Sequence, residues 1–433
     1  MNQKIKSIFS IFSLIFIFSI QVFGQTSLTI DRAVQLAVGS HPEIHQAKAS
    51  ISVSDAKLEY ANGSYYPVVT ASANYTWINP ISEVNFGAGT FKTNPENNYG
   101  AQIGAQYLLY DFGRRSTAVD AALTGKLAAE ENVELVTRNL AYQTIQVFYS
   151  ALFLKNAVSV QNEQLNALNT NLSYIQKKLD SGSATDFDIL STKVKIAAAE
   201  NTRIDLQNNL NTQLILLKRL TGIPEKESVD LNGNFEFGFS DINMDSLISN
   251  AVQNRIELKM AKTMNQSAIM KKSTAEKDNN PYLVGNVSWG LKNGYLPNFD
   301  AIRGTYIVGF QLQVPIFDGN KTESEVHEAE ANIRSSESKI EDVQLQINSD
   351  VRTAMENLNS CKQKLQTTDA QVDQAKKAVE QARIRYKNEL ITNLDLLSSE
   401  VSLSQAQLAN LQAKYTYQMA NYQLKRAIGE KIW

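Results

Sequence analysis

The sequence of 433 residues has few of the residues that most chemistry and most tight turns require. It contains one cysteine, three histidines, eight prolines and twenty glycines. A single cysteine excludes a disulfide within the chain, and so few prolines and glycines favour long, uninterrupted elements over many short ones. The formal net charge of -2 provides no basic surface for nucleic acid, so no nucleic-acid partner is expected.

Catalytic and cofactor-binding motifs are missing as well. The segment TGKLAAE around Gly125 and Lys126 lacks the upstream glycine and the Ser/Thr of a phosphate-binding loop. His41 and His45 are four residues apart, but a proline between them interrupts the helix that would align them, and no further ligand completes a metal site. Cys361 has no histidine near it in sequence, which favours a packing role. The sequence therefore predicts a protein that is not an enzyme and that binds no cofactor or metal.

Long apolar runs are missing after the N-terminus. Lys4 and Lys6 precede the apolar stretch 8–20, and residues 22–24 offer small or neutral side chains at a plausible cleavage site. The stretch is shorter than the ~20 residues that a membrane-spanning helix needs. We therefore interpret residues 1–24 as a secretory signal peptide rather than as an anchor, and we expect the mature chain to leave the cytoplasm.

What the sequence does have is an internal duplication. LKRLTG begins at Leu217 and returns as LKRAIG at Leu424, 207 positions later (424 against 217). Nearer the N-terminus the offset is 214, which places Pro67 over Pro281 (281 against 67). The two offsets differ by seven residues (214 against 207), which are missing from the second copy, and matches of this kind along the chain indicate a repeated structural unit. The predicted units are residues 25–222 and 241–433, joined by a linker at 223–240.

Each unit begins with a helix, predicted at 31–62 in the first unit with a break at His41–Pro42, and continues with alternating apolar and polar residues. Alternation is typical of strands with two different faces. None of the predicted strands contains a charged residue. Aromatic residues lie at strand ends, as the aromatic girdle of a membrane barrel requires. The predicted strands are 68–77, 99–110, 282–291 and 305–314, and the girdle residues are Trp77, Tyr99, Trp289 and Tyr306.

The rest of each unit is predicted to form a long helical hairpin, at 116–221 and at 321–428. Apolar residues recur every three or four positions from Leu140 to Leu179, a spacing that is typical of a coiled-coil seam. A similar seam is predicted on the returning helix of the second unit, beginning at Leu394. About 65 residues at ~1.5 Å each would form a rod of roughly 100 Å.

Four strands per chain are too few for a closed barrel. The smallest transmembrane barrels have about eight strands, and an open sheet edge in lipid leaves backbone groups unpaired. Two copies would pool eight strands, and three would pool twelve, enough for a water-filled lumen. The strand pattern alone also fits a soluble sandwich, in which case the chain would be a structural or adhesive trimeric stalk. A general porin is disfavoured because porins consist mainly of strands.

The order of these features resembles the TolC family of outer-membrane efflux proteins. The resemblance rests on the turns LYDFGRR (109–115) and IFDG (316–319), on the tip SGSAT followed by DIL, and on LKRLTG at the end of a repeat; it covers roughly residues 26–433. It implies a mainly α fold with a small antiparallel β part. Duplicated coiled-coil hairpins would form an α-barrel through the periplasm, and four strands per chain would contribute to a twelve-stranded transmembrane β-barrel of a homotrimer.

The resemblance also implies a function and partners. The chain would be the passive exit duct of a tripartite efflux pump or a type I secretion system in the outer membrane of a diderm bacterium. Its expected partners are a periplasmic adaptor protein, an inner-membrane pump of the RND or ABC type, and outer-membrane lipid.

The implied site residues lie at the two helical tips. In the family an aspartate of the motif that LDLL (394–397) matches narrows the periplasmic mouth, which makes Asp395 a gate residue; the second aspartate of the motif is replaced here by Ser398. Arg385 and Tyr386 match gate-tethering positions. From the residues alone, Asp395 can instead be a cap of the returning helix, and Tyr386 can be a packing residue without a tethering role.

The tips are also the expected docking surface for the adaptor. The family usually has glycine at both tips, but Glu389 stands where the second glycine is expected, and this departure bears on the geometry of docking. The expected docking residues are Gly182, Ser183, Ala184, Thr185, Leu390, Ile391 and Thr392.

Overall fold

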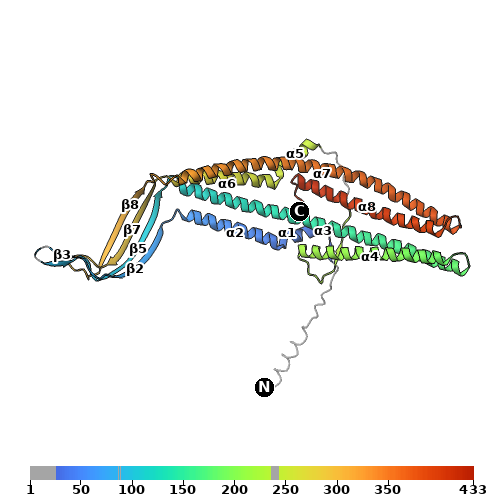
Figure 1. Ribbon diagram of the computed structural model, residues 1–433, viewed down its shortest axis with the longest axis horizontal. Helices are drawn as coiled ribbons and strands as arrows, with labels where there is room; N and C mark the ends of the chain where they lie inside the picture. Colours follow the sequence, from blue (N-terminus) through green and yellow to red (C-terminus); the bar gives the residue numbers. More distant parts are fainter. Residues whose placement is uncertain (1–25, 86, 88, 236–242) are drawn as a thin grey trace, which may run out of the picture.

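The computed structural model describes residues 26–433 apart from 86, 88 and 236–242. The predicted signal peptide and the end of the predicted linker lie outside the described residues. The chain is elongated, with a sheet at one end, the tips of two helical hairpins at the other, and its C-terminus near the middle (Figure 1). The fold is mainly α with a small antiparallel β part, which confirms the predicted class. Among the described residues, none of the helices combines the length and the apolar character needed to cross a membrane.

Two long helical hairpins form the body of the molecule. The first consists of α3 (Arg114–Asp180) and α4 (Asp186–Thr221), and the second of α7 (Lys321–Lys387) and α8 (Asn393–Ala427). α3 and α7 have 67 residues each, so each is a rod of ~100 Å.

The predicted seam of α3 is buried along most of its length, because alternate steps of three and four keep one stripe facing the neighbouring helices. In α8 the prediction for Leu394 is wrong, since this side chain is 52% exposed. At the start of α8, Asn393 and Leu397 are the buried residues, and Leu394 lies on the exposed side of the helix. The buried seam residues of α3 are Leu140, Ala151, Leu154, Val158, Leu165, Leu168 and Ile175.

Shorter helices precede each hairpin: α1 (Ile30–Ser40) and α2 (Pro42–Gly63) in the first half, α5 (Met244–Asn254) and α6 (Ile256–Asp278) in the second. The predicted break at His41–Pro42 is confirmed. His41 is the N-cap of α2, and its ring Nδ1 accepts a hydrogen bond from the backbone N–H of Glu43 at 3.3 Å.

One four-stranded antiparallel sheet lies beyond the N-terminal ends of α3 and α7. Its strands are β2 (Val68–Trp77), β5 (Asn97–Tyr110), β7 (Tyr282–Lys292) and β8 (Arg303–Gln313), in the order β2-β5-β7-β8. The outer edges of β2 and β8 are therefore unpaired in one chain. The prediction that the strands carry no charge is wrong at one end, because cross-strand pairing continues to Lys292 and Arg303.

Four further strands, which form two pairs, escaped the sequence patterns. The loop predicted at 78–98 contains a small hairpin of β3 (Glu83–Asn85) and β4 (Thr90–Lys92). β1 (Thr26–Leu28) pairs in parallel with β6 (Val229–Leu231), which lies inside the predicted linker. Segments of three residues are too short to show a period.

The largest apolar core lies near mid-length, where α1, the β1–β6 pair, α3 and α4 meet. Its centre is Phe148, which is fully buried. A second core joins α5, α6, α7 and the end of α8. The apolar clusters at mid-length are thus larger than the one at the second hairpin tip, which consists of Ala382, Tyr386 and Leu396.

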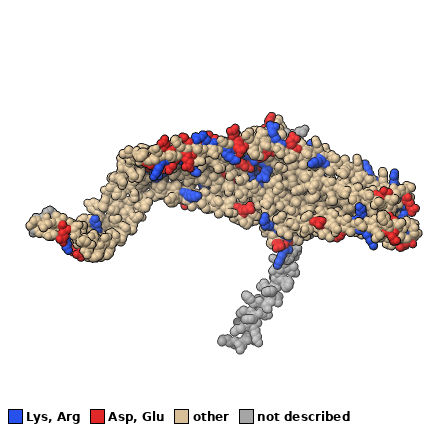
Figure 2. Space-filling view, viewed as in Figure 1, with Lys and Arg blue, Asp and Glu red and all other residues tan. Residues whose placement is uncertain are grey.

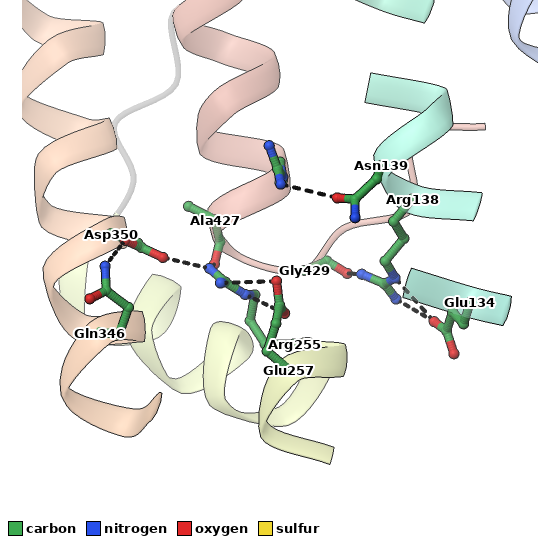
Figure 3. Close-up of polar contacts among 10 residues, drawn as sticks. Glu134, Arg138, Asn139, Arg255, Glu257, Gln346, Asp350, Ala427 and Gly429 are labelled. Carbon is green, nitrogen blue, oxygen red and sulfur yellow. Dashed lines mark hydrogen bonds and ion pairs between the residues drawn. The ribbon is translucent and has the colours of Figure 1, made fainter. Parts of the chain in front are cut away.

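Two arginines bind the backbone carbonyls at the end of α8 (Figure 3). The Arg255 Nη1 donates to the carbonyl of Ala427 at 3.2 Å and contacts the carboxylate of Asp350 at 3.1 Å. The Arg138 Nη1 donates to the carbonyl of Gly429 at 2.8 Å. These carbonyls have no partner within the helix, so both guanidinium groups stabilise its end.

The repeated LKR-x-x-G motif has a backbone explanation. Gly222 and Gly429 have φ angles of 71° and 75°, which is the left-handed conformation that ends a helix. A Cβ on Gly429 would lie 2.7 Å from the carbonyl carbon of Asn254. Each copy of the motif therefore ends a returning helix with a glycine that the turn requires.

Candidate membrane surface and helical tips

The four-stranded sheet has one apolar and one polar face. Cross-strand pairs place like with like: Ala73 is opposite Ala101, and Trp289 lies between Ile103 and Tyr306. The polar face carries mainly Thr, Ser, Asn, Gln and Gly. Figure 2 shows few charged groups over the sheet and many over the helices. In one chain the apolar face is open, with Phe310 74% and Val308 65% exposed.

The four predicted girdle residues share the apolar face and lie toward the end of the sheet farthest from the helices. Trp289 pairs with Tyr306, and the Tyr99 ring lies 5.3 Å from that of Tyr75. All four are at least half exposed. Their role as a girdle stays a prediction.

A second group of exposed aromatic residues lies at the other end of the sheet, where the chain passes into the helices. The strand pattern alone did not predict this group. Its signal in the sequence is the aromatic residues at or just beyond the strand ends, in SYYP and in the turns LYDFGRR and IFDG. Two aromatic groups at opposite ends of an apolar band are typical of membrane barrels. Its members are Tyr65, Tyr66, Tyr110, Phe112 and Phe317.

The two hairpin tips have the same backbone. Gly182 and Glu389 both have positive φ angles, 77° and 61°. In each tip the next residue donates its backbone N–H to a carbonyl of the preceding helix: Ser183 to Lys178 at 2.8 Å, and Leu390 to Arg385 at 2.9 Å. Glu389 thus adopts the conformation that glycine provides at the first tip.

Asp395 has a structural role at the second tip. Its carboxylate accepts hydrogen bonds from the Thr392 hydroxyl at 2.7 Å and from the Thr392 backbone N–H at 3.0 Å, while the Thr392 hydroxyl accepts from the Asp395 backbone N–H. The hydroxyl and then the backbone N–H of Thr392 lower the pKa of Asp395. Asp188 and Thr185 form the same capping box at the first tip. Helix capping therefore accounts for an aspartate at both positions, and a gate function of Asp395 stays a prediction.

The other predicted gate residues differ in their surroundings. Arg385 and Ser398 are exposed. Tyr386 is buried, 8% exposed, with its ring 5.9 Å from that of Tyr174 on α3. Burial raises the pKa of Tyr386. Tyr386 thus packs between the two hairpins, as expected for a packing residue. Its role in tethering the gate stays a prediction.

The structure adds residues that join the tips. The Lys178 ammonium lies 3.1 Å from the carboxylate of Glu389 and 5.3 Å from the centre of the Tyr386 ring. Its hydrogen bond to Glu389 is the main cause of a raised Lys178 pKa. Sequence periodicity does not reveal such contacts because the partners lie on different hairpins.

A buried asparagine makes the second connection between the tips. Asn393, 3% exposed, accepts from Asn171 at 2.9 Å and donates to the Thr192 hydroxyl at 3.2 Å. An open cleft of about 520 Å³ lies between the hairpins, with Asn171, Tyr174 and Tyr386 in its lining. In the part of the chain that the structure describes, no three His, Cys, Asp or Glu residues gather in a way that could hold a metal ion.

Comparisons with known proteins agree with this geometry. The family model described as outer membrane efflux protein matches residues 33–223 and 247–430. The chain is 21% identical to the outer membrane protein TolC of Salmonella enteritidis, over 90% of this chain and 79% of that protein. It is also 21% identical to the outer membrane efflux protein BepC of Brucella suis, over 94% and 87%.

Solved structures show the same fold. The Campylobacter jejuni CmeC outer membrane channel has a TM-score of 0.79 at 16% identity, covering 92% of this chain and 85% of that one. The open-state MtrE outer membrane channel of Neisseria gonorrhoeae has a TM-score of 0.77 at 17% identity, covering 93% and 89%. Because the family model matches most of the chain, this protein belongs to the outer membrane efflux protein family.

Proposed function

We propose that three copies of this chain form a passive exit duct through the outer membrane and the periplasm. The observation that carries this proposal is a sheet with one apolar face and two unpaired edges, β2 and β8. Unpaired edges cannot face lipid. Pairing β8 of one copy with β2 of the next satisfies both edges, and twelve strands leave room for a lumen.

The helices support the same assembly. α4 has a second apolar stripe, which the described residues of one chain leave exposed. Its members are spaced by three, by four and by multiples of seven residues, as in a coiled-coil seam. Contact with a neighbouring copy would bury it. Its members and their exposures are Phe187 68%, Leu190 60%, Val194 67%, Ile204 50% and Ile215 58%.

The division into two units, 25–222 and 241–433 with a linker at 223–240, is part of this proposal. It is supported by the equal lengths of α3 and α7, which are 67 residues each. Duplication supplies two strands and one hairpin twice, so three chains provide twelve strands and six hairpins.

The duct has no energy source of its own and therefore needs partners. We place a periplasmic adaptor protein at the hairpin tips, and an inner-membrane pump of the RND or ABC type beyond it. An exposed apolar side chain supports the second tip as a docking surface, since Leu390 is 72% exposed. The first tip presents Gly182, Ser183 and Thr185, all exposed.

At the periplasmic mouth, we assign the gate to Asp395, Arg385 and Tyr386. Three copies of Asp395 around one axis form a ring of carboxylates, which repel one another and favour cations. The exposed Arg385 is available to a neighbouring copy, and Tyr386 packs the two hairpins together. Ser398 follows one turn later and contributes no charge.

The test is to purify the full chain in detergent, determine its mass by light scattering, and measure its conductance in planar bilayers. We expect three chains per particle and a small conductance that rises in D395N/R385Q. The matched control is D188N, which alters the equivalent cap of the first tip. A soluble monomer would overturn the duct, whereas equal effects of D395N/R385Q and D188N on conductance would remove only the gate assignment.

A further inference from the structure

The four strands of the sheet carry only two charged residues, and both are cations. Lys292 ends β7 and Arg303 begins β8, and the antiparallel register places them directly opposite each other. Both side chains are exposed. They lie at the end of the sheet farthest from the helices, next to the loops (Figure 1).

Both cations belong to the polar face. Lys292 pairs with Gly100 on its other side, and Gly100 alternates with Asn98 and Gln102. Counting along β7, Lys292 shares its face with Gly290 and not with Trp289. If the apolar face is turned to lipid, Lys292 and Arg303 are turned to the lumen.

No carboxylate neutralises this pair among the residues that the structure describes. Like charges directly opposite each other in a sheet are unfavourable, so the arrangement is not explained by sheet stability. The Lys292 ammonium lies 5.1 Å from the centre of the Tyr295 ring. Asp300, the nearest acidic residue in sequence, forms no ion pair with either cation.

The dimensions of the proposed barrel bring these charges close to its axis. Twelve strands spaced ~4.8 Å apart and tilted about 40° enclose a barrel of roughly 12 Å radius. Lys and Arg carry their charges at the ends of three- or four-carbon stems, about 6 Å from the backbone, which leaves these charges roughly 6 Å from the axis. The Debye length at physiological ionic strength is about 8 Å, so the field of the ring extends across the lumen.

We infer that Lys292 and Arg303 of three copies form a ring of six cations at the outer mouth of the duct, and that this ring selects for anionic solutes. The inference rests on the proposed trimeric duct. Rings of Lys and Arg side chains favour anions in pores, so the cargo class is a solute with carboxylate or phosphate groups. At the other mouth, the proposed Asp395 ring has the opposite sign.

The test is the reversal potential of the reconstituted full-length trimer in a KCl gradient. In K292Q/R303Q we expect the chloride-to-potassium permeability ratio to fall on the order of threefold. The control is K92Q, because Lys92 lies on the projecting β3–β4 hairpin and is paired with Glu96 at 3.6 Å. This control is expected to leave the ratio unchanged.

A polyanion gives a second measurement. Inorganic tripolyphosphate added on the loop side is expected to reduce the current of the wild-type trimer, and the concentration needed should rise about tenfold in K292Q/R303Q. A trimer that conducts normally, with the same permeability ratio and the same block in the double variant, would overturn the ring alone. A chain that neither trimerises nor conducts would overturn the duct and, with it, the ring.

Discussion

The two hairpin tips have the same backbone and different side chains. Both place a residue in the left-handed conformation, Gly182 at one and Glu389 at the other, and both open the returning helix with a Thr–Asp capping box. The second tip alone contributes a buried tyrosine and a buried asparagine to the contact with its neighbour. The turn is thus set by backbone hydrogen bonds and caps that both copies share, whereas the connection between the hairpins depends on residues that the copies do not share.

The largest expected effect follows from Tyr386. Tyr386→Ala removes a buried ring from the contact with Tyr174 and leaves a cavity, so the second tip should lose about 3 kcal/mol of local stability. The position equivalent to Tyr386 at the first tip is Leu179, which is only half-buried, and Leu179→Ala should cost about 1 kcal/mol. Hydrogen exchange of the tip amides measures both.

Tyr386→Phe is the matched control for packing. It keeps the ring, so its exchange rates should stay near those of the wild type. Equal losses in Tyr386→Ala and Leu179→Ala would contradict the claim that the second tip depends more on side-chain packing.

The next effect concerns Asn393. Asn393→Ala leaves the Asn171 amide and the Thr192 hydroxyl without their partner between the hairpins, which should cost about 2 kcal/mol. The equivalent residue of the first tip, Asp186, is exposed, and Asp186→Ala should change stability by less than about 0.5 kcal/mol. The measurement is the rate at which two cysteines, introduced on α3 and α8 near the tips, form a cross-link. Separation of the hairpins should change this rate in Asn393→Ala and not in Asp186→Ala.

The difference between the tips also separates the features that the sequence could predict from those that it could not. The rods and the two-faced sheet were predictable because their signals are local: the seam of α3 repeats along one helix, and each strand alternates by itself. The capping boxes were within reach for the same reason, since Thr392 and Asp395 are three residues apart. Gly222 and Gly429 could be read as helix ends from the repeated motif.

Contacts between distant segments carried no such signal. Lys178 and Glu389 meet across two hairpins, and nothing in either tip sequence points to the other. β1 and β6 are too short to alternate, and they pair only because the mid-length core brings them together. Lys292 and Arg303 looked like loop residues because they follow and precede the alternating segments, and only the cross-strand register adds them to the sheet.

The capping boxes should respond alike at the two tips. Thr392→Ala and Thr185→Ala should each cost about 1 kcal/mol. The lowered pKa of Asp395 means that its contribution is present above the usual carboxyl value of 3.8 and is lost as the pH falls through the lowered pKa. Amide protection in the first turn of α8 should therefore fall in strong acid, and Thr392→Ala should flatten this fall. Clearly unequal losses in the two variants would show that the second cap has an additional role.

The smallest net effect is expected where the tips differ most in sequence. Glu389→Gly removes the strain of a left-handed non-glycine residue, about 1 kcal/mol, but it also removes the ion pair with Lys178, a pair with one exposed partner that contributes about 1 kcal/mol or less. The two changes oppose each other, so tip protection should stay within about 1 kcal/mol of the wild type.

In a Lys178→Gln background the ion pair is already lost, and Glu389→Gly should then increase protection. The reverse exchange, Gly182→Glu, adds strain and should lower protection at the first tip. If Glu389→Gly weakens the second tip equally with and without Lys178, the ion pair is not what compensates the strain at Glu389.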